Sequence, residues 1–167
     1  MSKNLIMRIK PNIEDKRLTR KIFGFNELLK RTKLDVIEEK PLSLFLNDQE
    51  IVTMMTINDY PKYLALGYLL NQNMISSRTK IDKVEYYDDL MTVVVRTKKP
   101  VNYQKKLKKK TITSGCAQGT LFGDIMESFK KIKFKETPKL KMSWIYELSK
   151  KINLMPSLYL KAGAIHG

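Results

Sequence analysis

The sequence has very few residues with metal-binding or nucleophilic side chains, because it contains a single cysteine, Cys116, and a single histidine, His166. One cysteine cannot form a disulfide within the chain. It also cannot supply the thiolates of a multi-cysteine zinc site. We therefore expect no metal site, and we expect a protein of the reducing cytoplasm.

Long apolar runs are also absent. The most apolar stretch, residues 64–70, is much shorter than the roughly 18 residues that a membrane-spanning helix needs. The first eleven residues scatter basic residues among apolar ones, so they lack the basic-then-apolar order of a signal peptide. Neither a GxGxxG nor a P-loop pattern occurs. These absences argue against a membrane protein and against a nucleotide-binding protein of the classes that these two motifs mark.

Positive charge is abundant: the formal net charge is +15. Such a charge attracts polyanions over long distances. However, only six of the 32 basic residues are arginines, the side chain that phosphate recognition prefers, and the lysine-rich segment 105–110 contains no aromatic residue for base stacking. A general bias toward lysine explains much of the charge. We do not expect nucleic acid as the main partner, although a basic nucleic-acid-binding module stays open as an alternative.

Apolar periodicity predicts an α+β fold. Alternating apolar residues on both sides of Asn47 and Asp48 predict a β-hairpin over residues 42–55. Helical spacing after Pro61, with Asn58 or Asp59 as the N-cap, predicts a helix that ends near residues 71–73. Residues 81–87 and 91–96 read as two further strands.

The same patterns divide the chain into three parts. We predict an extended or weakly ordered lead-in over residues 1–34, an α+β domain over 35–104, and a second region over 105–167 that begins in the lysine-rich segment. In that region a short strand at 111–113 leads to the cysteine. A helix from Phe122 and an amphipathic helix containing Trp144, Leu148 and Ile152 follow, and a strand precedes the turn at Gly163.

Cys116 has the neighbourhood expected of a reactive thiol. Gly115 and Gly119 flank it, five lysines lie upstream within eleven residues, and a predicted helix begins downstream. Positive charge and a helix N-terminus both favour the thiolate over the thiol and so lower the pKa of a cysteine. A buried, inert cysteine is the alternative, but buried cysteines usually have apolar neighbours, whereas Ser, Gly and Gln surround this one.

His166 is the other candidate for a functional side chain. It follows Gly163 in a segment of small residues, where an imidazole could act in catalysis or bind a cofactor. A structural role is equally compatible with a lone histidine. A Cys116–His166 pair stays open as well, because the sequence gives no distance between the two side chains.

Six segments, in order along the chain, resemble the FdhD/NarQ family of formate dehydrogenase accessory sulfurtransferases. They are DVIEEKPLSLFLN at residues 35–47, MMT at 54–56, YLALGYL at 63–69, NMI at 73–75, TSGC at 113–116 and KAGAIH at 161–166. The resemblance implies an N-terminal α+β domain followed by the start of a cytidine-deaminase-like α/β domain, which we expect to be truncated. The family's cysteine loop usually carries a second cysteine, whose position Gly119 occupies here.

The resemblance also implies a mechanism. A cysteine desulfurase would pass sulfur to Cys116, and the persulfide sulfur would go to the bis-guanine-dinucleotide molybdenum cofactor for formate dehydrogenase. Expected partners are therefore the desulfurase, formate dehydrogenase and the anionic cofactor, and a homodimer stays open. An inactive scaffold that docks the desulfurase or formate dehydrogenase without transferring sulfur is the alternative.

Overall fold

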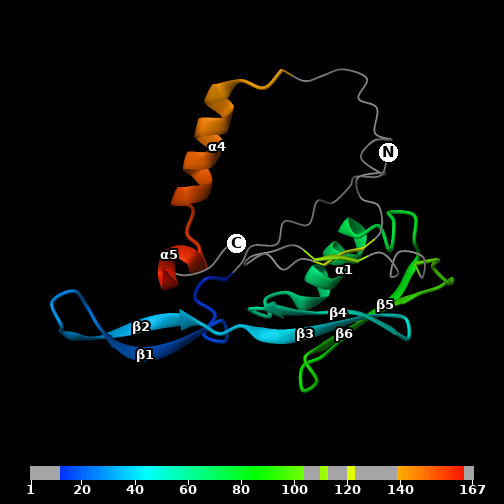
Figure 1. Cartoon of the computed structure of the whole chain (residues 1–167), viewed down its shortest axis with the longest axis horizontal. Coiled ribbons are helices and arrows are strands. Elements are labelled where there is room, and N and C mark those ends of the chain that lie inside the picture. Colours follow the sequence, from blue (N-terminus) through cyan, green and yellow to red (C-terminus); the bar gives the residue numbers. More distant parts are fainter. Residues whose placement is uncertain (1–11, 104–109, 113–119, 123–138, 164–167) are drawn as a thin grey trace. The chain divides into compact units, whose positions relative to one another are not determined.

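The computed structural model describes residues 12–103, 110–112, 120–122 and 139–163 (Figure 1). The chain divides into two compact units. One unit comprises residues 40–138, and the other combines residues 1–39 with residues 139–167. The predicted domain boundaries at 34/35 and 104/105 stay predictions.

A four-stranded mixed sheet is the centre of the unit formed by residues 40–138. Its strands are β3 (Lys40–Leu46), β4 (Gln49–Thr56), β5 (Ile81–Tyr87) and β6 (Thr92–Thr97), in the order β4-β3-β6-β5. The β3–β4 and β5–β6 pairs are antiparallel, whereas β3 and β6 run parallel. The predicted hairpin and the two predicted later strands are thus confirmed, and so is the α+β class.

The core follows from the two-residue period of β3. Leu42, Leu44 and Leu46 point to the same side of the strand and are fully buried. Helix α1 (Pro61–Asn71) contributes Ala65 and Leu69 to the same cluster. The remaining buried members come from the strands and from the segment after the helix, and they are Ile51, Met74, Ile75, Val93 and Val95. Burial of apolar side chains between the helix and the sheet is therefore the main source of stability here.

The start of α1 differs from the expectation. Pro61 occupies the first helical turn as predicted, but the N-cap residue is Tyr60, in a left-handed conformation with φ 47° and without a capping side chain. The prediction of Asn58 or Asp59 as N-cap was wrong. The Asn58 amide instead donates a hydrogen bond to the hydroxyl of Tyr86 on β5, so a tertiary contact takes the side chain that local capping would use.

Residues 19–37 form an antiparallel hairpin that the sequence patterns did not predict. It consists of β1 (Thr19–Phe25) and β2 (Arg31–Ile37). The Asn26 side-chain oxygen accepts hydrogen bonds from the backbone N–H groups of Leu28 and Lys30, at 3.1 and 2.9 Å, and so stabilises the turn. Of the extended or weakly ordered lead-in that the sequence suggested, these residues are extended, and they form paired strands rather than a weakly ordered segment.

The unit that combines residues 1–39 with residues 139–167 also contains, in its described part, the helices α4 (Met142–Leu154) and α5 (Leu158–Ala162). The amphipathic helix around Trp144 is thus confirmed. The prediction of a strand before Gly163 was wrong, since that segment forms helix α5. The Lys161 ammonium lies 2.9 Å from both the Ile13 carbonyl oxygen and a Glu14 carboxylate oxygen, and Leu158 is buried. Tertiary contacts therefore accompany the helical conformation of this short segment.

Candidate functional site

The two candidate residues lie outside the described part of the chain. Cys116 falls in residues 113–119, and His166 falls in residues 164–167. Their roles and any contact between them therefore stay predictions. The helix predicted from Phe122 also falls mostly outside the described residues, and Phe122 itself ends a strand.

The strands on either side of the cysteine segment are described, and they pair with each other. Strand β7 (Lys110–Ile112) precedes the segment and β8 (Thr120–Phe122) follows it. They run antiparallel, with Ile112 opposite Thr120 and Lys110 opposite Phe122. Because opposed α-carbons in such a pair are about 5 Å apart, the chain enters and leaves the cysteine segment at adjacent points. Residues 113–119 therefore connect the two strands of a β-hairpin.

This pairing also locates one end of the lysine-rich segment. Lys110 is the first residue of β7 and stands two positions before Ile112, where the pairing ends. A strand advances about 3.3 Å per residue, so the Lys110 backbone lies roughly 7 Å from Ile112, the last paired residue before the cysteine connection. The hairpin thus brings the end of a cationic run close to the segment that carries the only thiol of the chain.

Among the described residues, burial raises the pKa of Tyr68 and Tyr103, and local ion pairs cause the other pKa shifts. The Arg17 side chain, hydrogen-bonded to the carboxylate, lowers the pKa of Asp15 to about 2. A hydrogen bond from Lys83 to Glu85 raises the pKa of the lysine and lowers that of the glutamate. The Lys83 side chain is exposed, and the Asp15 and Glu85 side chains are partly exposed, so these shifts indicate ion pairing at the surface rather than proton-transfer chemistry.

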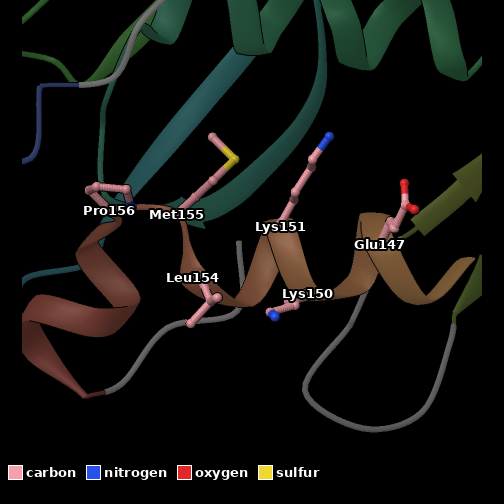
Figure 2. Close-up of a pocket in the computed structure, with 6 residues that line it drawn as sticks. All are labelled: Glu147, Lys150, Lys151, Leu154, Met155 and Pro156. Carbon is pink, nitrogen blue, oxygen red and sulfur yellow. The ribbon is translucent and has the colours of Figure 1, made fainter. Parts of the chain in front are cut away.

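A shallow hollow of about 500 Å³ lies against α4. It is lined by the helix and the two residues after it, namely Glu147, Lys150, Lys151, Leu154, Met155 and Pro156. Figure 2 shows Lys151 and Met155 on one side of the ribbon and Lys150 and Leu154 on the other. Side chains that diverge in this way do not converge on a small ligand as a built site requires. The hollow is therefore a feature of an exposed helix surface.

The described residues contain neither a metal-binding cluster nor a membrane-spanning helix. Within residues 12–103, 110–112, 120–122 and 139–163, no three His, Cys, Asp or Glu side chains lie close enough together to hold a metal ion. No helix in that part of the chain combines the length and the apolar character needed to cross a membrane.

Comparison with known proteins identifies relatives of this chain. A sequence model described as the FdhD/NarQ family matches residues 37–167. The sulfur carrier protein FdhD of Wolinella succinogenes is 27% identical over 136 residues, which cover 78% of this chain and 46% of that protein. The protein of the same name from Listeria innocua is 25% identical over 138 residues, covering 78% of this chain and 51% of the relative. The chain therefore spans about half the length of the curated relatives it matches.

A solved structure also shows similarity. The crystal structure of a formate dehydrogenase accessory protein from Desulfotalea psychrophila aligns with a TM-score of 0.40 and 19% sequence identity. The alignment covers 47% of this chain and 34% of that protein.

Proposed function

The chain belongs to the FdhD/NarQ family, since the family match covers residues 37–167, and from this membership we propose that it carries sulfur as a persulfide on Cys116. The relatives with the same match are named sulfur carrier proteins. Cys116 is the only thiol of the chain, and it lies in the connection between two paired strands. The proposal depends most on this last observation, because residues that carry function are often found on the connections between paired elements.

The loading step balances without an added oxidant. The Cys116 thiolate attacks the terminal sulfur of a persulfide on the desulfurase. The sulfur–sulfur bond of that persulfide breaks, and the cysteine of the desulfurase leaves as a thiolate while a new sulfur–sulfur bond forms on Cys116. The attacking group must be ionised, so a low thiol pKa accelerates the step at neutral pH.

The proposed acceptor is the bis-guanine-dinucleotide molybdenum cofactor of formate dehydrogenase. The sulfur–sulfur bond of the Cys116 persulfide breaks, and Cys116 returns to a thiolate. The reduced molybdenum of the cofactor supplies the two electrons that convert the transferred sulfur to sulfide. The cofactor is anionic because of its phosphates. We propose that the lysines of residues 105–110 attract this cofactor, or an acidic surface of the desulfurase, toward the cysteine connection.

Neutralising the lysines before the cysteine is expected to slow loading. When Lys105, Lys106, Lys108, Lys109 and Lys110 are replaced by Gln together, the local positive potential falls and the Cys116 thiol pKa rises. The measurement is the rate of persulfide formation in low and moderate salt. The wild type should be slowed by salt, and the Gln variant should be slower and less salt-dependent. The matched control replaces five exposed lysines outside residues 105–110 by Gln. Equal rates of persulfide formation for the wild type and the Gln variant of residues 105–110 would contradict this role for the lysines.

Persulfide formation itself is tested by alkylation. After incubation with the desulfurase and cysteine, the protein is treated with a biotin-linked alkylating reagent, bound to streptavidin and eluted with dithiothreitol. A reductant releases protein that was alkylated on a persulfide, because it breaks the sulfur–sulfur bond, whereas protein alkylated on a thiol stays bound. Release of the chain supports the proposal, and complete retention contradicts it.

A scaffold without sulfur transfer is the second candidate function. Gly119 occupies the position of the family's usual second cysteine, and the chain spans about half of its relatives. Under this alternative the chain binds the desulfurase or formate dehydrogenase but forms no persulfide. A stable complex together with complete retention in the alkylation assay would select it.

A further inference from the structure

One face of the β1–β2 hairpin combines aromatic rings with cations. Side chains alternate between the two faces of a strand, so Phe23 and Phe25 of β1 lie on the same face. The antiparallel register places Lys33 opposite Phe23 and Arg31 opposite Phe25, and directly opposed residues share a face. These four side chains, Phe23, Phe25, Arg31 and Lys33, form what we call the aromatic–basic face.

The cations of this face contact one of its rings. The Arg31 guanidinium lies 4.1 Å from the centre of the Phe23 ring, and the Lys33 ammonium lies 5.7 Å from the same point. Both distances are within the range of a cation–π interaction. The register and these contacts belong to the hairpin itself, so they hold for any position of residues 40–138 relative to it.

The two rings do not belong to the core of their own unit. On the opposite face of the hairpin, Ile22 and Val36 are partly buried. In contrast, the described residues of the unit leave at least 59% of the Phe23 side chain and 69% of the Phe25 side chain uncovered. Packing within the unit therefore does not explain why two phenylalanines alternate with cations on this face.

The charge of the hairpin favours an anionic ligand. Residues 19–37 contain five basic and two acidic residues, which gives a net charge of +3. Among the described residues, neither Arg31 nor Lys33 takes part in an ion pair. Both kinds of cation bind phosphate groups, and the planar guanidinium of an arginine also stacks on nucleic-acid bases. The aromatic–basic face can thus contact both the phosphates and the bases of one ligand.

We propose that the aromatic–basic face binds single-stranded nucleic acid. Proteins that bind single strands use aromatic rings, on which bases stack, beside cations that contact the phosphates. In a duplex the base faces are hidden within the stack, so a duplex cannot use the rings in this way. The lysine-rich segment 105–110 has no aromatic residue, and the hairpin supplies the combination that this segment lacks.

This binding is separate from sulfur transfer. The family match begins at residue 37, where β2 ends, so the four residues of the aromatic–basic face lie outside the matched region. The proposal therefore does not depend on Cys116. Cys116→Ala should bind single strands as the wild type does, and failure of this proposal is distinguishable from failure of sulfur loading.

Fluorescence anisotropy of the full chain with labelled oligonucleotides tests the proposal. The probes are single-stranded oligo(dT) and oligo(rU) of about 20 nucleotides, which exceeds the site size of one small binding domain, and a DNA duplex of the same length. We expect both single strands to bind, with an affinity that falls as the salt concentration rises.

Substitutions that keep the charge separate stacking from general attraction. Phe23→Ala together with Phe25→Ala should weaken binding of the single strands about tenfold or more and leave duplex binding unchanged. Phe23→Tyr together with Phe25→Tyr keeps both rings and should bind as the wild type does. Leu28→Ala with Leu29→Ala removes two other exposed apolar side chains of the hairpin and should leave binding of the single strands unchanged.

Substitutions of the cations give a second test that keeps the rings. Arg31→Gln with Lys33→Gln should weaken binding of the single strands and reduce its dependence on salt. Lys62→Gln with Lys150→Gln removes the same charge from exposed positions outside the hairpin and should weaken binding less. Circular dichroism and thermal unfolding of each variant should match the wild type.

Three results would overturn the inference. The first is an affinity for single strands that is the same with and without the rings of Phe23 and Phe25, which would show attraction by charge alone. The second is no binding of either single strand at low salt. The third is binding to anionic phospholipid vesicles, lost on replacing Leu28 and Leu29, without binding of oligonucleotides, which would identify a lipid surface as the ligand.

Discussion

Replacing Cys116 with alanine is expected to abolish sulfur loading and to leave the fold intact. The sequence offers no second thiol, so no other side chain can hold a persulfide. Transfer is measured with cysteine carrying radioactive sulfur: the desulfurase is loaded first, and the label bound to this chain is then counted after separation without reductant. Label on the alanine variant should fall to the level of a sample without desulfurase.

Two controls make this result specific. Cys116→Ser keeps the size and polarity of the side chain but lacks sulfur, so it should also remain unlabelled. Thermal unfolding of both variants should match the wild type, because residue 116 lies in the connection between β7 and β8 and outside the described apolar core. Label retained on either variant would show that sulfur binds without Cys116.

Replacing Leu44 with alanine is expected to destabilise the unit formed by residues 40–138. Leu44 is completely buried at the centre of β3 and belongs to the cluster that α1 and β6 complete. Removing a buried leucine side chain costs about 2–5 kcal/mol, because apolar burial is lost and a cavity remains. The free energy of unfolding, measured by urea denaturation, should fall by about this amount.

Leu90 provides the matched control. It belongs to the same unit, but its side chain is 67% exposed. Leu90→Ala should change the free energy of unfolding by no more than about 0.5 kcal/mol. Equal destabilisation by the two substitutions would contradict the assigned core. A Leu44→Ala protein with the wild-type free energy of unfolding would contradict the burial of Leu44 on β3.

The sheet could be predicted because the apolar period of β3 is regular, and α1 because Pro61 marks its start and apolar residues fill its length. Leu42, Leu44 and Leu46 repeat every second residue, and the Asn47–Asp48 turn follows them directly. Asn47 adopts φ 54°, a left-handed conformation that asparagine tolerates. Local pattern and tertiary structure agree in this region, so the strand bounds followed closely from the sequence.

The β1–β2 hairpin could not be predicted for a physical reason. Phe23, Phe25 and Leu34 stay largely exposed, and Arg31 lies over the Phe23 ring at 4.1 Å from its centre. Apolar residues here do not mark a buried face, so the two-residue period carries no inside–outside signal. The turn depends on hydrogen bonds to the Asn26 side chain, which apolar periodicity does not reveal.

The role of Cys116 stays a prediction, and the strands that flank it could be predicted only in part. The composition around Cys116 pointed to a reactive thiol, and the short strand predicted at residues 111–113 corresponds to β7 at Lys110–Ile112. The partner strand β8 was not predicted, because Phe122 was assigned to a helix by its spacing with later apolar residues. Three-residue strands pair through backbone hydrogen bonds and contain too few side chains to show a period.

Intact mass spectrometry of the wild-type chain after incubation with a cysteine desulfurase and cysteine tests the central claim most directly. The proposed chemistry predicts one species heavier by a single sulfur atom, which reverts to the unmodified mass after treatment with dithiothreitol. A chain whose mass never changes, under conditions in which the desulfurase itself carries a persulfide, would contradict Cys116 as a sulfur carrier.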